Sequence, residues 1–186
     1  MEDHLKEGNM IWVVLGVITI ILGLLLSFIL PSLIHMVMFT AGDLIYIKTP
    51  TASKILFPIG TVFLALFFFL MYYQSKKMRI AAGVSVILFV VISSLSLSSY
   101  SVIREERIVH SDFFTLSSTE YSWNDISNAV LLKGNEETPY ETLVLTMADG
   151  TELFYDRDPK LRTEFNKVDF ILESHGIYFS LKDRQS

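Results

Sequence analysis

The sequence predicts a membrane protein built from three transmembrane helices and a small C-terminal α+β domain. Two observations predict this fold class. Hydrophobic residues make up 51% of the 186 residues, and nearly all of this excess lies before Tyr100. From residue 101 onward the chain has an ordinary soluble composition, with 9 Lys and Arg against 16 Asp and Glu, a net charge of −7. We therefore divide the chain into a transmembrane region, 1–103, and a soluble domain, 104–186.

Three apolar runs without a charge are long enough to cross a bilayer. They are Met10–Leu30, Ile55–Tyr73 and Ile80–Tyr100. About 20 helical residues match the roughly 30 Å of the hydrocarbon core. The acidic N-terminal tail and Pro31 directly after the first run argue against a cleaved signal peptide. The chain is therefore expected to be a multi-pass protein of the cell membrane, in contact with the lipid bilayer.

The connector between the first two runs, residues 31–54, is harder to interpret. Ser32–Ile47 is apolar but short for a span, and it contains His35 and Asp43. We expect a loop that lies in the membrane interface or dips into it. Two interpretations of the ionisable residues stay open: both face the lipid headgroups, or they form a buried pair that marks a site.

Small residues recur on one side of the first run. Gly16, Gly23 and Ser27 fall on roughly one helix face. Small side chains let helix backbones approach closely in membranes. The pattern predicts a helix-packing face, within this bundle or toward a second copy or a partner chain.

The short connector 74–79 carries three positive charges, Lys76, Lys77 and Arg79. The positive-inside rule favours a cytoplasmic connector, which puts the C-terminal domain outside the cytoplasm. The opposing charges, near membrane ends on the other side, are Lys48, Lys54, Arg104 and Arg107.

The soluble domain reads as five or six antiparallel strands. Short β-rich runs begin at Ser101, and a further element starts with the run Tyr121–Ile126. Asp149-Gly150 separates the apolar runs Thr142–Met147 and Thr151–Tyr155, a strong hairpin signal.

A helix is predicted to close the domain. Asp158 is a good N-cap, and Pro159 suits the first helical position. Apolar residues then recur at helical spacing, and His175-Gly176 marks the C-terminal end. The apolar positions are Leu161, Phe165, Val168 and Leu172.

This order of strands and helix resembles the bacterial pleckstrin-homology-like (PH-like) domains. The resemblance rests on the Tyr121–Ile126 run, the Asp149-Gly150 hairpin and the Leu161–Leu172 helix, and it covers about 80 residues. It implies a strongly bent sheet capped at one end by a C-terminal helix, and a bacterial membrane context. It implies no catalytic residue.

The sequence offers little for catalysis. Without Cys there is no disulfide, thiol chemistry or Cys-ligated metal, and no nucleotide, protease or hydrolase motif is present. Two short clusters, His110-Ser111-Asp112 and Asp156-Arg157-Asp158, allow a metal or cation site. An exposed pair and helix capping with a salt bridge are the simpler interpretations. We expect no enzyme, no cofactor and no metal.

The acidic soluble domain also argues against nucleic acid as a partner. Trp123, beside Asn124 and Asp125, is either a core residue or one wall of a groove for a ligand or partner. The sequence therefore predicts a non-enzymatic membrane protein that presents a PH-like domain to a protein or peptide partner. The alternative is an accessory subunit of a transporter or other membrane complex, with the helices as the main interface.

Overall fold

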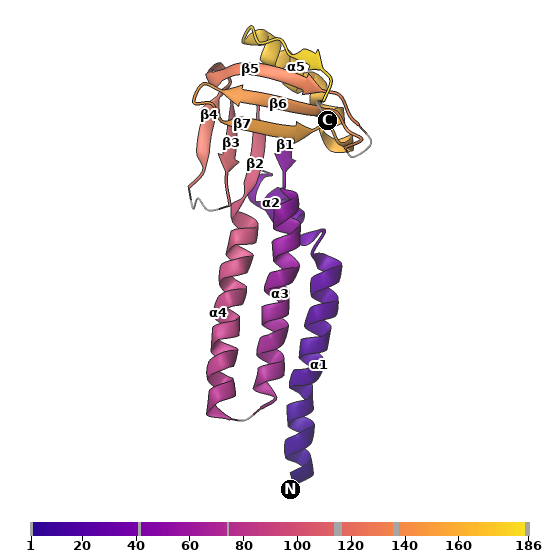
Figure 1. The fold of residues 1–186 in the computed structure, drawn as a ribbon, viewed down its shortest axis with the longest axis vertical. Helices are drawn as coiled ribbons and strands as arrows, with labels where there is room; N and C mark the ends of the chain where they lie inside the picture. Colours follow the sequence, from indigo (N-terminus) through magenta and orange to yellow (C-terminus); the bar gives the residue numbers. More distant parts are fainter. Residues whose placement is uncertain (1, 41, 74, 114–116, 136–137, 185–186) are drawn as a thin grey trace. The chain divides into compact units, whose positions relative to one another are not determined.

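The computed structural model describes residues 2–40, 42–73, 75–113, 117–135 and 138–184 (Figure 1). The chain divides into two compact units, which interleave along the sequence. The helical unit consists of the chain up to Met38, the segment Thr49–Tyr100 and the start of the loop at Asp112. The sheet-rich unit consists of the segments Phe39–Lys48 and Ser101–Ser111 and the chain from Ser117 onward. The chain therefore enters the sheet-rich unit more than once.

The helical unit contains α1 (Glu2–Leu26), α2 (Leu30–Phe39), α3 (Thr51–Met71) and α4 (Lys76–Ser98). Figure 1 shows α3 between α1 and α4, and α3 packs against both. The Ser96 hydroxyl donates to the Ser53 carbonyl over 2.7 Å and so joins α4 to α3. Most large apolar side chains on these helices point outward, as they do in a bundle surrounded by lipid.

Two of the three predicted spans are single long helices, and the first is a bent pair. Helices α3 and α4 are each long and apolar enough to cross a membrane, with mean hydropathy 2.2 and 2.5. The first predicted span, Met10–Leu30, is not one straight helix, because α1 and α2 meet at a bend of 64°. Pro31 has no N–H to donate to the preceding turn, so the helical ladder is interrupted there. The chain has two such helices, or three if the bent pair is one span.

The connector 31–54 is a helix and a strand, where the sequence predicted a loop. After α2, the strand β1 (Leu44–Lys48) pairs antiparallel with β2 (Tyr100–Arg104), with Ile47 opposite Val102. Strands β3 (Arg107–Ser111) and β4 (Thr119–Ser122) complete a sheet of order β1-β2-β3-β4. The first strand of this sheet is therefore supplied from between the helices.

A second sheet has the order β7-β6-β5-β8. It comprises β5 (Ile126–Leu132), β6 (Thr142–Met147), β7 (Glu152–Asp156) and β8 (Ser180–Lys182), and β8 runs parallel to β5. The predicted Asp149-Gly150 hairpin is confirmed: β6 and β7 pair antiparallel, and Gly150 has φ 87°. Only glycine adopts such a φ at little steric cost. In Figure 1, β5, β6 and β7 cross the direction of β2, β3 and β4.

Helix α5 (Pro159–Ser174) follows the second sheet, as predicted. The Asp158 carboxylate accepts hydrogen bonds from the N–H groups of Lys160 and Leu161, over 3.0 and 2.8 Å. His175 caps the end of the helix, and Gly176 has φ 73°. The apolar face of α5 lies in a core shared with both sheets, and its buried residues are Leu161, Phe165, Val168 and Leu172.

Candidate functional site

The predicted groove residues form a single turn of 3₁₀ helix, Trp123–Asp125, between β4 and β5. Trp123 is 1% exposed, and its indole N–H donates to the Glu105 carbonyl over 2.9 Å. Asp125 accepts a hydrogen bond from the Ser122 N–H over 2.7 Å and so closes a capping box. Of the three, only Asn124 and Asp125 are exposed. The indole therefore belongs to the core, where burial of its large aromatic surface stabilises the fold. A groove at this place would lack the aromatic wall that the sequence suggested.

Two of the three predicted helix-packing residues, Gly16 and Gly23, lie where α1 meets α3. A Cβ on Gly16 would come within 2.8 Å of the Phe69 ring, and one on Gly23 within 2.6 Å of the Thr61 Cβ. Ser27 is 1% exposed and donates to the Leu24 carbonyl over 2.7 Å. These small residues therefore serve contact within the chain.

His35 and Asp43 each have a partner of their own, so the alternative of a His35–Asp43 pair is wrong. The ring nitrogens of His35 lie 2.9 Å from the Thr49 hydroxyl and 3.0 Å from the Leu97 carbonyl, and the side chain is fully buried. Asp43 accepts from Arg104 over 2.7 Å. That hydrogen bond is the main reason why the pKa of Asp43 is lowered from its ordinary value.

The Asp156-Arg157-Asp158 cluster, which allowed a cation, is occupied by structural contacts. Asp156 accepts from the Thr142 hydroxyl over 2.9 Å, and Asp158 caps α5 while also accepting from Tyr46 over 3.2 Å. Across the part of the chain that the structure describes, no three His, Cys, Asp or Glu side chains gather as metal ligands would.

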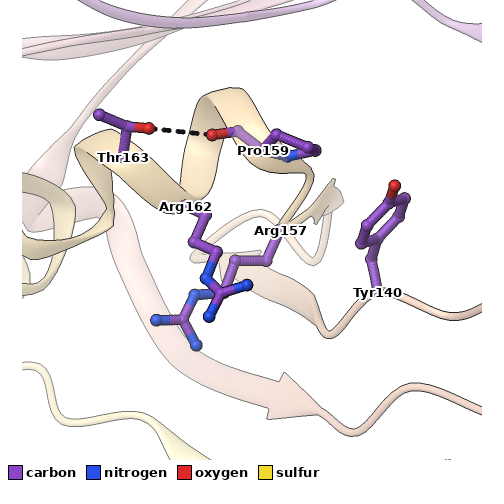
Figure 2. A pocket seen from close by; sticks show the side chains of 5 residues that line it. All are labelled: Tyr140, Arg157, Pro159, Arg162 and Thr163. Carbon is purple, nitrogen blue, oxygen red and sulfur yellow. Dashed lines mark hydrogen bonds between the residues drawn. The ribbon is translucent and has the colours of Figure 1, made fainter.

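A pocket that the sequence did not indicate lies at the start of α5 (Figure 2). It has a volume of about 320 Å³ and is lined by Tyr140, Arg157, Pro159, Arg162 and Thr163. In the view of Figure 2 the guanidinium groups of Arg157 and Arg162 overlap, and Tyr140 lies on the other side of the pocket. The Thr163 hydroxyl donates to the Pro159 carbonyl over 3.0 Å, and so it faces its own helix backbone.

Arg157 is held in place from several directions. Its backbone N–H donates to the Glu141 carbonyl over 2.7 Å, and its guanidinium pairs with the Glu141 carboxylate over 2.5 Å. The guanidinium carbon lies 4.1 Å from the centre of the Phe165 ring, a cation–π contact. The Nε–H of Arg157 is buried and has no hydrogen-bond partner among the described residues. A buried donor left in this state costs about 1–3 kcal/mol.

The other polar groups of the pocket are more accessible. Arg162 is exposed, and Tyr140 is 46% exposed. Within the described ranges, neither side chain has a hydrogen bond or ion pair. The pocket lining therefore holds two guanidinium groups, of which that of Arg157 is paired with the Glu141 carboxylate beside the pocket and that of Arg162 has no ion pair within the described residues.

Comparison with known proteins identifies no relative. No protein-family model, no curated protein and no solved structure matches the chain.

The arrangement is suited to binding rather than to bond-breaking chemistry. Arginine stays protonated at physiological pH and cannot act as a general base. It does present parallel N–H donors in a rigid fork that matches an oxyanion. The pocket could not be predicted from the sequence, because its polar residues come from three different elements. Tyr140 lies in a loop, Arg157 follows the end of a strand, and Arg162 lies in a helix. Only the pair of arginines five positions apart was visible beforehand.

Proposed function

We propose that this chain is a multi-pass protein of the cell membrane that presents a small PH-like domain to a protein or peptide partner, without catalysing a reaction. The observation that carries the proposal is the way the chain builds the sheet-rich unit. Strand β1 comes from the connector before α3, and β2 directly continues α4. A domain joined to apolar helices at two points is restrained near the bilayer, where a tether raises the effective concentration for a partner.

The PH-like assignment rests on the order of elements. Strands β1 to β7, in two crossing sheets, precede one amphipathic helix whose apolar face lies in the core, and the short parallel strand β8 follows it. The core is large for a small domain and is built from both sheets and α5. A domain with a packed core and edge strands suits binding by surface contact.

The alternative is an accessory subunit of a membrane complex, with the helices as its main interface. Its sequence support was the small-residue face of Gly16, Gly23 and Ser27. Because Gly16 and Gly23 pack on α3 of the same chain, this face offers less for a partner. The remaining outward faces of the helices are apolar, which suits lipid equally well.

Site-specific photocrosslinking in the full-length chain distinguishes the two functions. A benzophenone amino acid is placed at Tyr140 or Phe170, both exposed in the sheet-rich unit, and at Ile87, exposed on α4. We expect one recurring polypeptide, identified by mass spectrometry, from the first two positions and only lipid adducts from Ile87. Protein adducts from Ile87 alone would favour the accessory subunit, and none from any position would remove both functions.

The proposal places the sheet-rich unit outside the cytoplasm, because the connector with Lys76 and Lys77 is expected inside. The chain has no Cys, so single cysteines report sidedness cleanly. We expect a membrane-impermeant thiol reagent to label Glu173→Cys but not Lys77→Cys in intact cells. The reverse labelling pattern would invert the orientation.

A further inference from the structure

We propose that the pocket at the start of α5 binds a carboxylate group of a peptide partner, between Arg157 and Arg162 on one side and Tyr140 on the other. This inference rests on the proposed function, since the partner is taken to be a peptide or protein. It adds to that function the chemical group that the partner must carry and the residues that recognise it.

The charge of the pocket calls for one further anion. Arg157 and Arg162 line the same pocket (Figure 2). Glu141 compensates Arg157 over 2.5 Å. Arg162 has no ion pair within the described residues. Two like charges in one pocket repel each other, and a monoanion between them would be attracted to both guanidinium groups and offset that repulsion.

The geometry favours a planar oxyanion. The guanidinium of Arg157 is fixed by Glu141 and by the Phe165 ring at 4.1 Å, so binding does not have to order it. Arg162 is exposed and one turn into α5, so its side chain is free to close on a ligand. Paired guanidinium groups recognise a carboxylate through parallel N–H donors.

The helix N-terminus is not what binds the anion here. Its free N–H groups at Lys160 and Leu161 already donate to the Asp158 carboxylate. The recognition therefore depends on the two arginine side chains, and it can be removed without uncapping α5.

A carboxylate suits the pocket better than a phosphate or a lipid headgroup. Residues 101–186 carry a net charge of −7, which repels a dianion and an anionic membrane surface. One uncompensated positive charge is balanced by one carboxylate. The half-exposed ring of Tyr140 and the exposed Pro159 place apolar surface beside the arginines, where an apolar residue next to the carboxylate would lie.

The test uses the full-length chain in nanodiscs of zwitterionic lipid, labelled with ¹⁵N-arginine. The probes are an acetylated, amidated dipeptide of phenylalanine and glutamate, its glutamine counterpart, and inorganic phosphate, all at equal ionic strength. The Nε–H resonances of Arg157 and Arg162 are assigned with Arg157→Lys and Arg162→Lys. Arg162→Gln is the test variant. Lys160→Gln removes the same charge from the same helix end, outside the pocket lining, and is its matched control.

We expect the glutamate dipeptide to shift both resonances saturably and the glutamine dipeptide to leave them unchanged. Arg162→Gln should weaken binding about 10-fold or more, since a hydrogen-bonded charge pair is lost. Arg162→Lys, which keeps the charge but not the fork, should bind with intermediate affinity, and Lys160→Gln should bind as the wild type does.

Three results would overturn the proposal. Equal shifts from both dipeptides would mean that the pocket does not recognise the carboxylate. The same shifts from chloride alone would mean an adventitious ion only. Tighter binding of phosphate would assign the pocket to a phosphate ligand. Unchanged affinity in Arg162→Gln would place binding elsewhere. If the crosslinks at Phe170 form in the wild type while the glutamate dipeptide does not bind to the same protein, the proposed function stands without this site.

Discussion

Replacing Gly23 with alanine would add one methyl group where α1 meets α3. The new Cβ would lie 2.6 Å from the Cβ of Thr61 and 3.0 Å from its Cγ2. Thr61 cannot easily turn away, because it is 8% exposed and its hydroxyl donates to the Pro58 carbonyl over 2.8 Å. Overpacking of this kind costs about 1–3 kcal/mol.

Gly83 provides the matched control. A Cβ there would meet nothing within 4 Å, so Gly83→Ala keeps only the intrinsic effect of alanine in a helix, a gain of about 0.5–1 kcal/mol. Since both substitutions share this intrinsic effect, the difference in stability between the two variants reports the clash with Thr61.

A buried thiol just after α1 reports opening of the helical unit. Ser27→Cys places the thiol one turn beyond Gly23, at a position 1% exposed, in a chain without other cysteines. In detergent, the rate of labelling by N-ethylmaleimide follows the population of the open form. We expect Gly23→Ala to label roughly 5 to 150 times faster than Gly83→Ala, the range set by the steric cost.

A second substitution, at Thr61, should compensate for the clash that Gly23→Ala creates. Thr61→Gly removes the atoms that the new methyl group would meet, so combining it with Gly23→Ala should cost less than the two single substitutions added together. Equal labelling of Gly23→Ala and Gly83→Ala, or strict additivity in the double variant, would refute the close approach of α1 and α3 at Gly23.

Three further substitutions test the sheet-rich unit. Tyr155→Phe deletes a fully buried hydroxyl that lies 2.7 Å from the Ser101 hydroxyl, and it should lower the free energy of unfolding by about 1–3 kcal/mol, measured by chemical denaturation. Asp158→Ala uncaps α5 and should cost about 1–2 kcal/mol, with earlier loss of α5 amide protection in hydrogen exchange. For the Asp43–Arg104 pair, the pKa of Asp43 is lowered in the folded state, so its stabilisation is present above the ordinary value of 3.8 and is lost as the pH falls through the lowered value. Arg104→Gln should therefore lose less stability than the wild type between pH 6 and pH 3 in thermal melts.

Each of these has a control or a contradicting result. Tyr178→Phe removes a hydroxyl from a side chain 73% exposed and should be neutral, so equal effects at Tyr155 and Tyr178 would contradict the buried contact. Unchanged exchange in Asp158→Ala would mean that the cap is dispensable. Parallel pH profiles for the wild type and Arg104→Gln would mean that Asp43 titrates alike in the folded and unfolded chain.

The elements that follow from local rules were predictable. The spacing of Leu161, Phe165, Val168 and Leu172 predicts one buried helix face, and all four are buried. Asp149-Gly150 specifies its hairpin, because the turn needs the positive φ that Gly150 adopts. In these cases the determining residues are neighbours in the sequence.

Strand β1 shows where local rules stop. Leu44–Lys48 is a short apolar run inside a longer one, and it becomes a strand only because Tyr100–Arg104, more than fifty residues later, supplies its hydrogen-bond partners. Trp123 is similar, since its burial depends on the Glu105 carbonyl across the fold. Pairing between distant segments leaves no periodic signal in either segment alone.

The sequence by itself determined the apolar helices, the acidic sheet-rich domain, the hairpin and the capped C-terminal helix, because composition, period and capping act over a few residues. Only the tertiary structure decided that α1 and α2 meet at a bend, that β1 joins the sheet, and that Gly16 and Gly23 face α3. It also brought Tyr140, Arg157 and Arg162 into one pocket. Such contacts depend on which distant surfaces complement each other in shape and charge, and that is settled when the whole chain packs.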